Sequence, residues 1–125
     1  SQDFQAKRRR IAQATRRTVE AWGLEVFCAN PAAQSSSLTA VMMPEGHDAD
    51  KFRKIVLDNF DMSLGVGLSK LAGKVFRIGH LGDFNELMLM GTLAGVEMGL
   101  ALSGTPHHPG GVNAAMKHFV ETCNS

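Results

Sequence analysis

The sequence contains few aromatic residues and little cysteine. Aromatic side chains make up 6% of the 125 residues, with one tryptophan and no tyrosine, so a core has to be built mainly from aliphatic side chains, methionine and phenylalanine. The two cysteines, Cys28 and Cys123, lie far apart and show no metal-ligand spacing, which argues against a cysteine-based zinc site. No secretory signal opens the sequence, and we therefore expect two free thiols in a cytoplasmic protein.

Neither sign of charge is in excess. Thirteen basic and twelve acidic residues leave a formal net charge of +1, which gives the chain no general attraction to nucleic acid or to anionic membranes. Basic residues do gather near the N-terminus, but no aromatic residues alternate with them, so a solvated or docking face is favoured over a phosphate-binding one. We expect no nucleic-acid partner.

Long hydrophobic runs are also missing. The most apolar stretch, Leu87 to Leu102, is shorter than the ~20 residues that a membrane-spanning helix needs, and Glu97 interrupts it. We therefore expect no membrane contact, and interpret this stretch as a buried or interface helix.

The familiar motifs of catalytic sites are absent from the sequence. There is no nucleophile elbow, no phosphate-binding P-loop and no dinucleotide-binding fingerprint. The five histidines do not form a ligand set, since His107 and His108 are adjacent and have no carboxylate at ligand spacing. The sequence predicts neither a metal site nor a complete set of catalytic residues.

The chain, with 44% hydrophobic residues, fits one domain covering residues 1–125. Hydrophobic periodicity predicts helices over 4–22, 48–60, 83–102 and 112–123, strands over 24–28, 38–43 and 75–78, and a strand or loop over 62–68. This order predicts an α+β fold: a small, mostly antiparallel sheet of three to four strands, with helices on one face.

The helix expected over 83–102 has the clearest signals. Asp83 and Glu86 have the spacing of a capping box, which predicts that Asp83 is the N-cap. Gly91, Gly95 and Gly99 follow at intervals of four and so lie on one side of the helix. Three glycines there would let another backbone approach closely.

Arg77 lies inside the apolar strand VFRIG and is the candidate functional residue. Because side chains alternate along a strand, Phe76 and Ile78 point to one face and Arg77 to the other. If Phe76 and Ile78 pack on the helices, Arg77 projects from the uncovered face of the sheet. There it can lie in water, pair with a local carboxylate or bind an anionic ligand with two hydrogen bonds, and spacing alone favours the ion pair over the ligand site.

The segment around Arg77 also carries a family resemblance. KVFRIGHLGDFNELMLMGTLAGVEMGLAL (74–102) resembles the signature near the end of class V pyridoxal-phosphate aminotransferases, in the serine–glyoxylate and alanine–glyoxylate branch. The segments ATRRTVEAWGLEVFC (14–28), SSLTAVMMPEGHDADKFRK (36–54) and FDMSLGVGLSKLAGK (60–74) are similar to the same proteins in the same order. The resemblance covers nearly the whole chain.

The resemblance implies a fold and a site. It implies the small C-terminal domain of a two-domain, fold-type I enzyme that passes an amino group from serine or alanine to glyoxylate. The family's carboxylate-binding arginine corresponds to Arg77, and Gly65, Gly67 and His80 are expected to line the same cleft. Active sites of this family are usually built at a dimer interface, which implies a homodimer.

The resemblance also implies that the cofactor machinery lies elsewhere. The Schiff-base lysine, the aspartate on the pyridine nitrogen and the phosphate-binding residues belong to the family's large domain, which the helix 4–22 would follow. The first residues, Ser-Gln, also suggest a piece of a longer protein. We therefore expect a chain without pyridoxal phosphate or activity of its own, which self-associates through the surface exposed for that domain. The alternative is a stand-alone α+β binding or interaction module.

Overall fold

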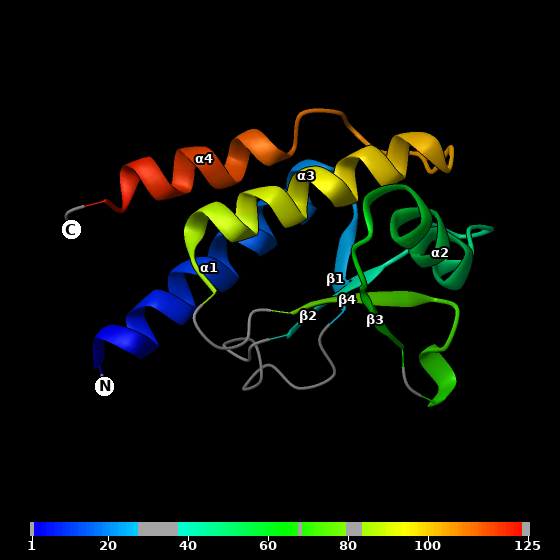
Figure 1. The fold of residues 1–125 in the computed structure, drawn as a ribbon, viewed down its shortest axis with the longest axis horizontal. Helices are drawn as coiled ribbons and strands as arrows, with labels where there is room; N and C mark the ends of the chain where they lie inside the picture. Colours follow the sequence, from blue (N-terminus) through cyan, green and yellow to red (C-terminus); the bar gives the residue numbers. More distant parts are fainter. Residues whose placement is uncertain (1, 28–37, 68, 80–83, 124–125) are drawn as a thin grey trace.

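A computed structural model describes residues 2–27, 38–67, 69–79 and 84–123. Its helices and strands follow the predicted order (Figure 1). The helices are α1 (Gln2–Ala21), α2 (Ala49–Phe60), α3 (Glu86–Leu102) and α4 (Val112–Glu121), with a short 3₁₀ turn η2 (Ser69–Leu71). The strands are β1 (Glu25–Phe27), β2 (Leu38–Met42), β3 (Gly65–Val66) and β4 (Val75–Gly79). The predicted α+β fold is confirmed.

The four strands form an antiparallel sheet in the order β1-β2-β4-β3. Val41 of β2 lies between Val26 and Phe76, and the neighbouring Ala40 lies opposite Arg77. Directly opposed residues share a face of the sheet, so Val41 and Phe76 define one face, and Ala40 and Arg77 the other.

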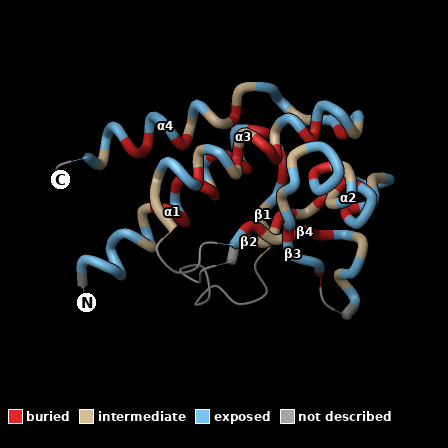
Figure 2. Tube along the Cα trace, in the orientation of Figure 1, coloured by how far each residue is buried: buried red, intermediate tan, exposed pale blue. Residues whose placement is uncertain are grey.

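The core lies between the sheet and the helices. Val41, Phe76 and Ile78 are fully buried on the helix side of the sheet, where α1 packs on β1 and β2, and α2 packs on β4 (Figure 2). α4 packs outside them, against α1 and α3. The core is largely aliphatic, as expected; Trp22 is completely buried, and the rings of Phe52 and Phe76 pack 4.7 Å apart.

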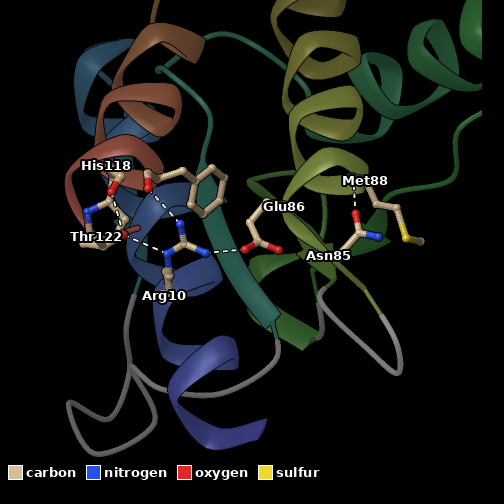
Figure 3. Close-up of polar contacts among 7 residues, drawn as sticks. Arg10, Asn85, Glu86, Met88, His118 and Thr122 are labelled. Carbon is tan, nitrogen blue, oxygen red and sulfur yellow. Dashed lines mark hydrogen bonds and ion pairs between the residues drawn. The ribbon is translucent and has the colours of Figure 1, made fainter. Parts of the chain in front are cut away.

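The expected start of the third helix is wrong. α3 begins at Glu86, and its N-cap is Asn85, whose side chain accepts a hydrogen bond of 2.9 Å from the Met88 backbone N–H. Asp83 lies outside the described residues. The capping box fails because Glu86 is the first residue of the helix, and its carboxylate pairs with Arg10 of α1 instead (Figure 3).

Two of the three glycines on α3 do allow a close approach. A Cβ atom on Gly99 would lie 2.5 Å from Val56 Cγ2, and one on Gly95 would lie 2.9 Å from Met62 Cε. A Cβ on Gly91 would meet nothing within 4 Å. Gly99 therefore lets α3 approach α2, and Gly95 makes room for Met62, which follows α2.

Gly99, which is closely packed, and Gly91, which is not, give a matched test of this packing. We expect Gly99→Ala to lower the free energy of unfolding by about 1–3 kcal/mol, because the new methyl group overlaps Val56 and Phe52. Gly91→Ala should raise it by up to about 1 kcal/mol, because alanine is the better helix former and the site is open. Urea denaturation at low protein concentration measures both. Equal effects of the two substitutions would contradict the packing at Gly99.

In the part of the chain that the structure describes, no helix has both the length and the apolar character needed to cross a bilayer.

Candidate functional site

Arg77 lies in the middle of β4 on the face of the sheet opposite to the core. It is half-buried, whereas Phe76 and Ile78 on either side of it are completely buried against the helices. The residues directly opposite are Ala40 of β2 and Gly65 of β3, which carry the two smallest side chains. Among the described residues, the neighbouring strands therefore leave space around the guanidinium group.

One end of the Arg77 guanidinium is held by the backbone. Its Nε donates a hydrogen bond of 2.9 Å to the carbonyl oxygen of Val66 in β3. Among the described residues, no carboxylate lies within ion-pair distance of Arg77, so the ion pair that spacing alone favoured is not found there. Within the described part of the chain, no acidic group takes the two terminal nitrogens, and a carboxylate can accept from both at once.

The glycines of the β3 segment allow this arrangement. A Cβ atom on Gly65 would lie 3.0 Å from Arg77 Cβ, and one on Gly67 would lie 2.3 Å from the Leu71 carbonyl oxygen. β3 therefore comes close to β4 and η2 only with glycine at both positions. Their role as lining of a substrate cleft stays a prediction, and His80 lies outside the described residues.

Gly67→Ala tests whether this segment positions Arg77. The added methyl group would overlap backbone, so we expect the segment to shift and the hydrogen bond from Arg77 Nε to Val66 to break. In the ¹⁵N-labelled chain, the side-chain Nε–Hε signal of Arg77 should move and its hydrogen should exchange faster with water. Gly91→Ala is the control, because the space around Gly91 is open. An unchanged Arg77 signal in a folded Gly67→Ala chain would disprove the positioning role.

An open cavity of about 540 Å³ lies where β2 ends and β4 begins. Its lining includes Met42, the last residue of β2, and Lys74, which precedes β4. The lining also includes the exposed Glu25 and Glu45 and the half-buried His47. No group of histidine, cysteine and acidic residues that could hold a metal ion occurs among the described residues.

The sequence interpretation missed a carboxylate that joins three elements. Glu97 of α3 accepts hydrogen bonds from Trp22 Nε1 at 2.8 Å, from the Gly110 N–H at 2.8 Å and from the Val112 N–H at 3.1 Å. It thus ties α3 to the end of α1 and to the start of α4. The signal was present in the sequence, because a single charge within an apolar helix requires a partner.

Hydrogen bonding sets the charge state of Glu97. Burial alone would raise its pKa, but the hydrogen bonds from Trp22, Gly110 and Val112 outweigh burial and lower it. The carboxylate is therefore ionised at neutral pH.

A second polar contact ties the other end of the helices together. Arg10 of α1 pairs with Glu86 of α3 and donates to Thr122 Oγ1 at 2.7 Å and to the Phe119 carbonyl oxygen at 2.8 Å (Figure 3). Its guanidinium also lies 4.9 Å from the centre of the Phe119 ring. A backbone hydrogen bond and the contact with Arg10 lower the pKa of Glu86. Both contacts are structural, and they hold the helix layer behind the Arg77 face.

The chain is similar to glyoxylate aminotransferases along most of its length. It is 47% identical over 112 residues to a serine–glyoxylate aminotransferase of Methylorubrum extorquens, which covers 89% of this chain and 28% of the relative. It is 42% identical over 118 residues to an L-aspartate–glyoxylate aminotransferase of Paracoccus denitrificans, which covers 94% of this chain and 30% of the relative. No protein-family profile matches the chain.

A solved structure supports the same relationship. The fold matches a ureidoglycine–glyoxylate aminotransferase of Bacillus subtilis with a TM-score of 0.84 and 26% identity, over 92% of this chain and 30% of that one. The chain thus spans about three tenths of the length of the relatives it matches. Over most of its length, the chain is therefore similar to one part, about three tenths, of glyoxylate aminotransferases.

Proposed function

We propose that this chain is the substrate-carboxylate-binding C-terminal domain of a longer, class V, pyridoxal-phosphate-dependent aminotransferase. The longer protein passes an amino group from a small amino acid, serine or alanine, to glyoxylate. The observation that carries this proposal is the Arg77 guanidinium: it lies on an open sheet face, with Nε held by Val66 and its terminal nitrogens without an acidic partner among the described residues. The names of the relatives support the reaction class.

A guanidinium held in this way binds a carboxylate with better geometry than a simple positive charge at the same place would. Because Nε is held by the Val66 carbonyl, the plane of the guanidinium is fixed before any ligand arrives. Its terminal nitrogens then bind both oxygens of a carboxylate side by side, which fixes the direction of the bond from the carboxylate to Cα. Arg77 therefore positions the substrate, and the bond-making steps belong to other groups.

The residues of this chain do not fit the cofactor itself. A lysine that binds an aldehyde covalently has to lie in a site with a lowered pKa, and such sites are sheltered from water. All six lysines of the chain are described and exposed, and Lys54 pairs with Asp58 instead. We propose that another part of the longer protein holds pyridoxal phosphate, and that the 125-residue chain alone is inactive.

The gene upstream of Ser1 tests this proposal. We expect an uninterrupted reading frame that encodes a domain with the family's cofactor-binding lysine. A start codon directly before Ser1 would instead favour the stand-alone binding module. The proposal also includes a cytoplasmic homodimer with its active site at the subunit interface; the exposed free thiol of Cys123 agrees with a reducing compartment.

A further inference from the structure

His118 is a buried titratable residue of α4 that the proposed function does not use. Its side chain belongs to a residue that is only 4% exposed. α4 packs on α1 and α3, so the buried side of α4 faces these two helices. The Nε2 atom of His118 is buried and has no hydrogen-bond partner among the described residues. Buried polar atoms are normally paired, so an unpaired one in a helix contact calls for a physical explanation.

Two arginines of α1 act on His118. Arg10 Nε donates to Thr122 Oγ1 at 2.7 Å, and that hydroxyl donates to the His118 carbonyl oxygen at 2.7 Å (Figure 3). Arg10 and Arg17 both repel a positive charge on the imidazole, whereas Glu121, exposed on α4, attracts one. Burial has the largest influence, and together with the two arginines it lowers the pKa of His118 below its ordinary 6.5.

The carboxylates of α3 do not compensate for these arginines. Its two acidic residues are already engaged, since Glu86 pairs with Arg10 and Glu97 accepts three hydrogen bonds. A protonated imidazole carries a hydrogen on both ring nitrogens, so Nε2 of His118 would become a charged donor without an acceptor among the described residues. The docked helix therefore disfavours the charged form of His118.

α4 depends on its docking to stay helical. It has ten residues, and its N-cap, Gly111, makes no side-chain capping bond. An isolated helix shorter than about 12–15 residues is marginal in water. The buried residues of α4 are Ala115, His118 and Phe119, so His118 is a large part of the docked side. Only Ala115 and Phe119 of α4 belong to the main core cluster, and most of the core is therefore built without this helix.

We propose that protonation of His118 releases α4 from α1 and α3 in mild acid, while the sheet and the inner helices stay folded. In the released helix the imidazole lies in water and takes up a proton at its ordinary pKa, whereas the docked form does so only at lower pH. Docking is therefore at full strength above about pH 6.5 and weakens as the pH falls through the lower, docked-state value.

This release does not rest on the proposed function. α4 lies outside the inner helices, whereas Arg77 projects from the opposite face of the sheet. The pH range also differs from that of Glu97, whose ordinary pKa is 4.5 and is lowered further in the fold. The effect of His118 therefore appears at higher pH than that of Glu97.

Amide hydrogen exchange of the ¹⁵N-labelled chain tests the release. The protection factor of an amide is the exchange rate of an unstructured peptide at the same pH divided by the observed rate. Between pH 7 and pH 5, we expect the protection factors of α4 to fall by up to about tenfold for each pH unit below 6.5, until the docked-state pKa is reached. The amides of β4 should stay better protected than those of α4 throughout, because α4 opens without the sheet.

Two variants that cannot take up the proton isolate His118. His118→Phe keeps a ring of similar size, and His118→Gln keeps a neutral polar side chain. In both, the protection factors of α4 should no longer depend on pH in this range. His108→Gln is the matched control: His108 is an exposed histidine in the loop before α4, and its replacement should leave the full response.

Three results would overturn the proposal. Constant protection of α4 down to pH 5 in the unmodified chain would show that protonation does not weaken docking. A fall in both His118 variants as large as in the unmodified chain would assign the response to another group. Equal protection factors in α4 and β4 would show that α4 leaves only when the whole domain unfolds.

Discussion

Replacing Arg77 by glutamine in the longer enzyme that we propose should lower kcat/KM for the amino donor by about 10²–10³-fold. Two charge-assisted hydrogen bonds to the substrate carboxylate would be lost, which together are worth about 3–4 kcal/mol. Much of the loss should be a rise in KM, because binding of the amino donor depends on its carboxylate. Arg77→Lys should recover only part of the activity, since an ammonium group keeps the charge but not the two parallel donors.

A donor without a carboxylate separates this role from a structural one. The unmodified enzyme should strongly prefer serine to serinamide, whose amide carries no charge. In Arg77→Gln this preference should largely disappear, because the partner that distinguishes the two compounds is gone. Steady-state kinetics with both donors measures the ratio. Arg9→Gln is the control, since Arg9 is exposed on α1, far from the Arg77 face. A preserved preference for serine in Arg77→Gln would refute the assignment.

Strand periodicity was enough to find the face on which Arg77 lies. Alternation of side chains in VFRIG placed Phe76 and Ile78 toward the helices and Arg77 away from them, and the structure agrees. The hydrogen bond that holds Arg77 could not be predicted in the same way. Its acceptor is the backbone carbonyl oxygen of Val66. Because every residue has such a group, the residue type at position 66 does not predict the bond.

Helix boundaries depend on which of several caps forms. The helix predicted to start at residue 48 does start there: Asp48 is the N-cap of α2 and accepts a hydrogen bond from the Asp50 N–H. Asp83 was predicted by the same rule and was wrong, because Asn85 two residues later caps α3 and Glu86 is drawn to Arg10. The pattern of local residues was equally good in both cases. In the second case Glu86 also forms an ion pair with Arg10 of α1, which the local sequence does not show.

Glu97→Ala should lower the free energy of unfolding at pH 7 by about 2–4 kcal/mol. The substitution leaves the indole N–H of Trp22 and the backbone N–H groups of Gly110 and Val112 without their acceptor. Trp22 is completely buried, and its indole already lies so close to Gly111 that a Cβ there would be 2.3 Å from its Cδ1. Little room is therefore left for water to replace the carboxylate. Glu97→Gln should cost less, since an amide oxygen can still accept.

The contribution of Glu97 should also depend on pH in a defined direction. Its pKa is lowered below the ordinary 4.5 by the hydrogen bonds it accepts, so the unfolded chain binds a proton at higher pH than the folded chain does. Stability from Glu97 is therefore complete above about pH 4.5 and is lost as the pH falls through the lower, folded-state value. Urea denaturation of Glu97→Ala should show a weaker loss of stability in acid than the unmodified chain. Glu20→Ala, at an exposed position on α1, should keep the full dependence. Identical acid profiles for Glu97→Ala and Glu20→Ala would show that this carboxylate does not hold the three helices together.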